Sequence, residues 1–115
     1  MEIWHNPRCS KSRETLGILT DAGVDPTVRR YLDDPPDAEE LARVLDLLGL
    51  APWDVTRFGE QVAKDLGLKD RPREDPAAWI DLLVANPRLI ERPIVVDGDR
   101  AVVGRPPENV HTLLA

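Results

Sequence analysis

The single cysteine of this chain, Cys9, lies in a polar segment where a thiol can act as a nucleophile. Residues 5–13 read His-Asn-Pro-Arg-Cys-Ser-Lys-Ser-Arg, between a short apolar run and a helical pattern, so Cys9 falls at the expected start of a helix. A lone cysteine is more often a small buried hydrophobe, but these polar flanks argue against a core strand. The free N–H groups and partial positive charge of a helix N-terminus lower a thiol's pKa. We therefore expect a reactive thiolate at Cys9.

The start of the same helix also predicts an anion site. Its first backbone N–H groups are expected to point into the space above the sulfur, where a tetrahedral oxyanion can sit. These groups belong to Ser10, Lys11 and Ser12. A protonated His5 and the side chain of Arg8 or Lys11 would lower the thiol's pKa further.

One cysteine excludes an internal disulfide, an intrachain dithiol pair and a cysteine-based zinc site. Ser12 stands where thioredoxins carry their second cysteine, three residues after the first. If the chain does redox chemistry, the second thiol must come from another molecule. No metal is expected.

Length and charge favour one small acidic domain over residues 1–115. The chain has 115 residues and a formal net charge of −6, which argues against a general affinity for nucleic acid or an anionic membrane. No apolar run approaches the roughly 20 residues of a membrane span, and the first residues lack the pattern of a signal peptide. We expect a cytoplasmic protein, and the acidic surface favours a monomer.

The elements that must position Cys9 begin with a strand at 2–4, a helix over 10–22 ending at Gly23, and a strand at 26–31. Such a unit is a right-handed βαβ with parallel strands. A helical stretch follows, with Asp37 and Glu40 as a capping box, Gly49 as a stop, and shorter helices over 52–57 and 59–66. Asp75-Pro76 opens one more helix.

Near the C-terminus the pattern becomes ββα. Residues 94–96 and 101–103 are β-rich triplets around an Asp-Gly turn, and a last helix begins at Pro106. The order predicts an α/β fold: a thioredoxin-like mixed four-stranded sheet with helices on both faces and a helical insertion at about 37–70. Trp4, Trp53 and Trp79 are expected in the core, and His111 at the surface.

Around Cys9 the chain resembles a known family, the glutaredoxin-coupled arsenate reductases of bacteria. The resemblance rests on His5-Asn6-Pro7-x-Cys9 with Ser12-Arg13 and Thr15-Leu16, and it runs along nearly the whole chain. It continues through Tyr31-Leu32, Pro35-Pro36, Arg57, Arg92-Pro93-Ile94-Val95-Val96 and Gly104-Arg105-Pro106. The match is closest to the short subgroup that reads His-Asn-Pro-Arg-Cys-Ser-Lys-Ser-Arg.

The resemblance implies a role for each motif residue. Cys9 would displace an oxygen of arsenate to give a covalent arsenyl-cysteine, His5 would tune the sulfur, and Ser12 could hydrogen-bond the thiolate. Three arginines would neutralise the oxyanion, for which a planar guanidinium is suited. They are Arg57, Arg92 and Arg105. Thioredoxin-like proteins also place a cis-proline before the third strand, which predicts a cis Arg92–Pro93 bond.

The implied reductants are external. Glutathione (or mycothiol in an organism that lacks it) would attack the adduct, and glutaredoxin would resolve the mixed disulfide and release arsenite. No bound cofactor is implied.

Each arginine also has a purely structural interpretation. Arg57 would then be an exposed helix residue, and Arg92 would pair with Glu91 or Asp97. Arg105 is the most informative of the three, because a cation just before a helix N-terminus is unfavourable unless an anion binds there too.

Three other functions stay open. A related enzyme could act on another oxyanion or on a mixed disulfide. A redox-responsive, transcription-regulator-like interaction protein fits the fold, although those proteins carry a C-x-x-C pair. A monothiol glutaredoxin-like protein holding an iron–sulfur cluster fits less well, because an arginine triad has no role there.

Overall fold

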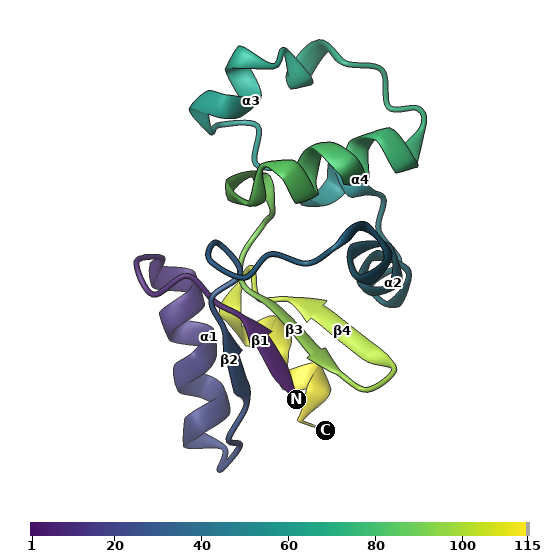
Figure 1. Ribbon diagram of the computed structural model, residues 1–115. Coiled ribbons are helices and arrows are strands. Elements are labelled where there is room, and N and C mark those ends of the chain that lie inside the picture. The colour runs from purple at the N-terminus through teal and green to yellow at the C-terminus, as the bar shows by residue number, and fades with distance from the viewer. Residues whose placement is uncertain (115) are drawn as a thin grey trace. The chain divides into compact units, whose positions relative to one another are not determined.

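The computed structural model describes residues 1–114, which form two compact units. Unit 1 comprises Met1–Asp34 and the segment from Arg92 onward, and unit 2 comprises Pro35–Glu91 (Figure 1). Every sequence-predicted site residue except Arg57 belongs to unit 1. That residues 1–115 form a single domain remains a prediction from the sequence.

Unit 1 is built on the predicted mixed sheet of four strands. Its strands are β1 (Glu2–Trp4), β2 (Thr27–Arg29), β3 (Ile94–Asp97) and β4 (Arg100–Val103), in the order β2-β1-β3-β4 (Figure 1). β1 and β2 are parallel and are joined by helix α1 (Ser10–Asp21), so the predicted βαβ unit is confirmed. β3 is antiparallel to both β1 and β4. The β3–β4 hairpin turns at Gly98, whose φ of 61° suits a residue without a side chain.

The core of unit 1 forms where α1 and the last helix pack together on the sheet. Its buried members come from β1, α1, β3 and that helix: Ile3, Leu19, Val95, Val110 and Leu113. Because successive strand residues face opposite sides, Ile3 and Val95 point toward these helices. Burial of this cluster anchors the carboxyl end of β1, from which the Cys9 loop departs.

Unit 2 is helical, and the caps predicted at Asp37 and Asp75 open two of its helices. It contains α2 (Ala38–Leu48), α3 (Gln61–Asp65), α4 (Pro76–Ala85) and the 3₁₀ turns η1 (Pro52–Val55), η2 (Leu68–Asp70) and η3 (Pro87–Leu89). The Asp37 carboxylate accepts from the N–H of Glu40 at 2.8 Å, and Asp75 accepts from Ala78 at 3.4 Å. The helical segment continues past residue 70 to η3.

Aromatic packing organises unit 2 around Trp79. This side chain is fully buried, and the rings of Trp53 and Phe58 meet it edge-on at centroid distances of 5.9 and 6.2 Å. The predicted core placement is confirmed for Trp4 and Trp79, while Trp53 is only half-buried. His111 is exposed, as expected.

Several predicted elements differ from the structure: the helices predicted over 52–57 and 59–66 are the shorter η1 and α3. The last helix is a 3₁₀ helix, η4 (Pro107–Leu113), rather than an α-helix, and β2 covers only 27–29 of the predicted 26–31. Prolines and short apolar spacings predict where such elements start but do not distinguish the two helix types. Among the helices of residues 1–114, none is both long and apolar enough to cross a membrane.

Candidate active site

Cys9 is the N-cap residue of α1, at the end of a loop braced by its own polar groups. The Cys9 N–H donates to the carbonyl of Asn6 at 3.0 Å, and the Asn6 side-chain oxygen accepts from the N–H of Arg8 at 3.0 Å. The Arg13 guanidinium donates to the carbonyl of Pro7 at 3.0 Å. These contacts hold the half-buried sulfur over the first turn of the helix.

The pKa of Cys9 is lowered from the ordinary thiol value. Burial alone would raise it, but the N–H of Ser12, the side chain of Arg92, the N–H of Lys11 and the charge of Arg105 together outweigh burial. The predicted thiolate is thus supported, through backbone groups and two distant arginines. The side chains expected to help, those of Arg8 and Lys11, are not among the groups that lower this pKa. The Lys11 side chain is about half exposed, and its ammonium lies 3.8 Å from the Glu14 carboxylate. The backbone N–H of Lys11 donates to the Cys9 sulfur.

Arg105 reaches the sulfur from the segment that follows β4. Its Nη2 lies 3.4 Å from Cys9 Sγ, and its Nε donates to the carbonyl of Arg92 at 2.8 Å. The position just before η4 thus faces the Cys9 sulfur, whose lowered pKa favours the anionic form, and this accounts for a cation at this helix start.

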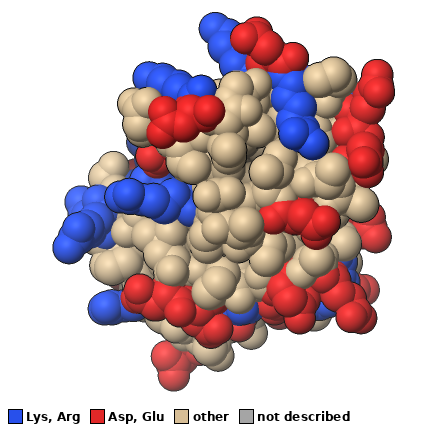
Figure 2. All heavy atoms as spheres, turned by 45° about the horizontal axis from the view of Figure 1, so that its top comes forward, with Lys and Arg blue, Asp and Glu red and all other residues tan. Residues whose placement is uncertain are grey.

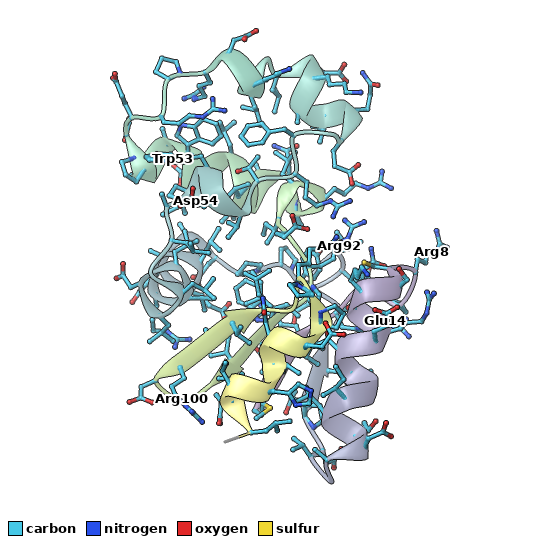
Figure 3. All side chains as sticks on the ribbon, turned by 180° about the vertical axis from the view of Figure 1, so that it is seen from behind. Arg8, Glu14, Trp53, Asp54, Arg92 and Arg100 are labelled. Carbon is cyan, nitrogen blue, oxygen red and sulfur yellow. The ribbon has the colours of Figure 1, made fainter. Side chains whose placement is uncertain are left out.

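Arg92 is held between Cys9 and Tyr31. Burial alone would lower the pKa of Arg92, but hydrogen bonds with the side chains of Cys9 and Tyr31 raise it. Figure 3 shows Arg92 beside the start of α1, whereas Arg8 extends outward from the loop before that helix. Tyr31 is fully buried, and sequence reasoning assigned it no role in the site. The sequence signal for Tyr31 was its place in the Tyr31-Leu32 segment that follows the second strand.

His5 and Ser12 form a buried pair, and their expected roles toward the thiolate stay predictions. His5 Nδ1 lies 2.6 Å from Ser12 Oγ, which also accepts from the N–H of Asn6 at 3.1 Å. Burial lowers the pKa of His5, as do the charges of Arg30 and Arg13, so a neutral ring is favoured. The Ser12 hydroxyl therefore stabilises the loop, while the backbone N–H of Ser12 donates to the Cys9 sulfur. Ser10 opens α1 with its side chain exposed.

Pro93 and Gly104 set the wall of the site opposite α1. The Arg92–Pro93 bond is cis, as predicted, and Arg105–Pro106 is cis as well. The Gly104 N–H donates to the Pro93 carbonyl at 2.9 Å. A Cβ on Gly104 would lie 2.5 Å from Thr15 Oγ1 and 2.8 Å from Pro93 Cγ, so only glycine allows this approach.

Arg57 belongs to unit 2, where it makes two ion pairs. Its Nη1 donates to Glu91 at 2.9 Å and its Nε to Glu60 at 3.3 Å, with the side chain about one-quarter exposed. It follows η1 and is not an exposed helix residue. Its role in substrate binding stays a prediction.

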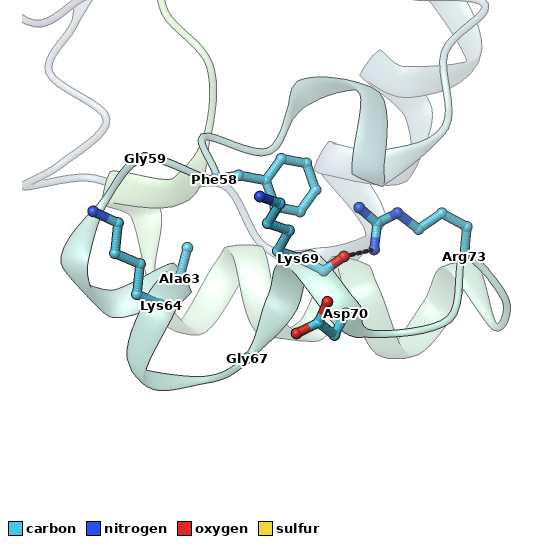
Figure 4. Close-up of a pocket in the computed structure, with 8 residues that line it drawn as sticks. All are labelled: Phe58, Gly59, Ala63, Lys64, Gly67, Lys69, Asp70 and Arg73. Atoms are coloured by element: carbon cyan, nitrogen blue, oxygen red, sulfur yellow. Dashed lines mark hydrogen bonds between the residues drawn. The ribbon is translucent and has the colours of Figure 1, made fainter.

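The pocket in Figure 4 lies entirely within unit 2 and contains none of the predicted site residues. It measures about 610 Å³ and is open. Its lining consists of Phe58, Gly59, Ala63, Lys64, Gly67, Lys69, Asp70 and Arg73.

The surface charges on the face drawn in Figure 2 are of both signs. Within residues 1–114, no group of three or more His, Cys, Asp or Glu side chains could hold a metal.

A parallel β1-α1-β2 unit with an antiparallel hairpin, a cysteine at a helix start and a cis-proline define a thioredoxin-like protein with a single cysteine. The ArsC family model matches residues 4–113, so the chain belongs to the ArsC family.

Relatives and solved structures agree with this membership. The arsenate reductase of Neisseria meningitidis serogroup B is 44% identical and matches 99% of this chain and 97% of its own. A Streptomyces viridochromogenes protein described as "Uncharacterized protein in glnII region" is 50% identical over 100% of this chain and 99% of its own. The structure of the arsenate reductase from Vibrio cholerae superposes with a TM-score of 0.91 at 44% identity, covering 96% of this chain and 94% of that one.

Proposed function

We propose that this chain reduces arsenate to arsenite through a covalent arsenyl-cysteine at Cys9, with glutathione and glutaredoxin as external reductants. The observation that carries the proposal is the thiolate environment: Arg105 Nη2 lies 3.4 Å from Cys9 Sγ, and backbone N–H groups of α1 face the same sulfur. Family membership and the arsenate reductases among its relatives support the substrate.

In the first step the Cys9 thiolate attacks arsenic. A sulfur–arsenic bond forms, and one arsenate oxygen takes up a proton and leaves as water. The guanidinium groups of Arg92 and Arg105 stabilise the oxygens that carry the charge, and the N–H groups of Lys11 and Ser12 donate from the start of α1. Preorganised donors of this kind are worth several kcal/mol when charge develops.

In the second step a glutathione thiolate attacks the Cys9 sulfur. A disulfide forms, and the sulfur–arsenic bond breaks with its electron pair left on arsenic, which is reduced from As(V) to As(III). Glutaredoxin then attacks the glutathione sulfur of the mixed disulfide and returns Cys9 as a thiolate. The second thiol is external because Ser12 stands where an intrachain partner would be.

The test is arsenate-dependent NADPH oxidation with glutathione, glutaredoxin and glutathione reductase supplied. We expect turnover by the wild type and none by Cys9→Ser, while the exposed-residue control His111→Gln retains wild-type turnover. A silent wild type is tested next with the mycothiol system. Silence in both, from folded protein with a titratable thiol, would exclude arsenate and leave another oxyanion or a mixed disulfide as substrate.

A further inference from the structure

We propose that Asn109 is a positioning residue for Arg105, and that its side-chain amide sets the distance between the guanidinium and the Cys9 sulfur. This inference rests on the proposed function, in which Arg105 stabilises the thiolate and its adduct. None of the sequence motifs discussed above includes Asn109.

Asn109 braces the chain on both sides of Arg105 from within η4. Its Nδ2 donates to the carbonyl of Val103 at 3.2 Å and to the carbonyl of Arg105 at 3.0 Å. Its backbone N–H donates to the carbonyl of Pro106 at 3.0 Å. One half-buried amide thus ties the last residue of β4 to the first turn of the helix that follows.

The chemistry of the contact is specific to asparagine. An amide nitrogen carries two hydrogens, and both are needed to serve two carbonyl oxygens at once. Aspartate offers no donor and would place a negative charge against the two carbonyls. Glutamine keeps the amide but displaces it by one methylene.

A second set of contacts holds the other side of the same segment. The Gly104 N–H donates to the Pro93 carbonyl at 2.9 Å, and Arg105 Nε donates to the Arg92 carbonyl at 2.8 Å. The backbone of Arg105 is therefore held through Asn109, while its guanidinium is held by the segment before β3. Nη2 is then directed at the sulfur, at 3.4 Å. Removing the amide releases the backbone end of this arrangement.

The experiment is a double-mutant cycle with Asn109→Ala, Arg105→Gln and the double variant. Thiolate absorbance against pH and the alkylation rate of Cys9 at a fixed pH below the titration midpoint report the sulfur's environment. We expect Arg105→Gln to slow alkylation about tenfold, as for loss of a hydrogen bond to a charged group, and Asn109→Ala about threefold. In the Arg105→Gln background, Asn109→Ala is expected to have no further effect. Should Asn109→Ala fail to fold, Asn109→Gln replaces it in the cycle.

The matched control is Asn86→Ala, which removes an amide donating to the Leu82 carbonyl at 3.0 Å in unit 2. It is expected to lower stability without changing Cys9 alkylation. An Asn109 effect that persists undiminished without Arg105, or no effect beside a clear one from Arg105→Gln, overturns the positioning role alone. If Arg105→Gln itself leaves the thiol unchanged, the role of Arg105 in the proposed function fails as well.

Discussion

Arg105 Nη2 lies 3.4 Å from the sulfur of Cys9, although 96 positions separate the two residues in the chain. The contact pairs a permanent cation with the one thiol of the protein. Since Arg105 also donates to the Arg92 carbonyl, its guanidinium has a fixed direction. This pair is the centre of the candidate site.

Arg105→Gln is expected to raise the pKa of Cys9, because the variant loses a positive charge beside the thiolate. The sign follows from the lowered thiol pKa: the folded protein favours the charged form, and removing a cation reduces that preference. Thiolate absorbance across a pH titration measures the change. Arg100→Gln, a charge loss at the far end of β4, serves as control and should leave the titration midpoint at the wild-type value. An unmoved midpoint in Arg105→Gln would contradict the assignment.

The loss of folding stability at acidic pH is expected to depend in part on His5. Its pKa is lowered from 6.5 by burial and by the charges of Arg30 and Arg13. The unfolded state therefore binds the proton more readily, so this contribution to stability is present above about pH 6.5 and is lost as the pH falls through the folded-state value. Free energies of unfolding in urea between pH 7 and pH 5 should decline less in His5→Asn than in the wild type.

His111→Asn is the control for that comparison, because it removes the chain's other histidine from an exposed position. It should keep the wild-type decline. An equal decline in His5→Asn and the wild type would mean that the buried His5–Ser12 pair does not govern the acid limb.

Gly104→Ala is expected to destabilise the protein by about 1–3 kcal/mol, the usual cost of overpacking. The new Cβ would lie 2.5 Å from Thr15 Oγ1 and 2.8 Å from Pro93 Cγ, so α1 and the segment before β3 must separate. Urea unfolding measures the loss. Gly17→Ala within α1 is the matched control, since its Cβ meets nothing within 4 Å. There alanine should stabilise the helix by about 0.5–1 kcal/mol.

Arg57→Gln tests the one arginine whose assignment comes from the family resemblance instead of contacts with Cys9. If it holds the oxyanion, kcat/KM for arsenate should fall by about a hundredfold, as for loss of one preorganised donor. The alkylation rate of Cys9 should stay at the wild-type value. Arg88→Gln, at an exposed position in the same unit, is the control. A wild-type kcat/KM in Arg57→Gln would contradict the substrate-binding role and assign Arg57 a structural role, through its ion pairs with Glu60 and Glu91.

The sequence by itself determined most of the elements and the position of the one cysteine at a helix start. Apolar periodicity, helix caps such as Asp37 and Asp75, and the Asp-Gly turn act over a few residues, so they are readable locally. The polar flanks of Cys9 and the pattern of a following helix likewise place the thiol at a helix start. The cis Arg92–Pro93 bond was predictable because it belongs to a recognisable motif.

Only the tertiary structure decided which groups act on the sulfur. Arg8 and Lys11 are neighbours of Cys9 in the chain, but the side chains that act on its sulfur are those of Arg92, just before β3, and Arg105, just after β4. Burial decided that His5 favours a neutral ring and that the Ser12 hydroxyl serves His5. The contacts of Tyr31 with Arg92, and of Asn109 with the carbonyls of Val103 and Arg105, likewise exist only in the folded chain. Long-range contacts and desolvation depend on how distant segments pack, and local patterns carry no record of that packing.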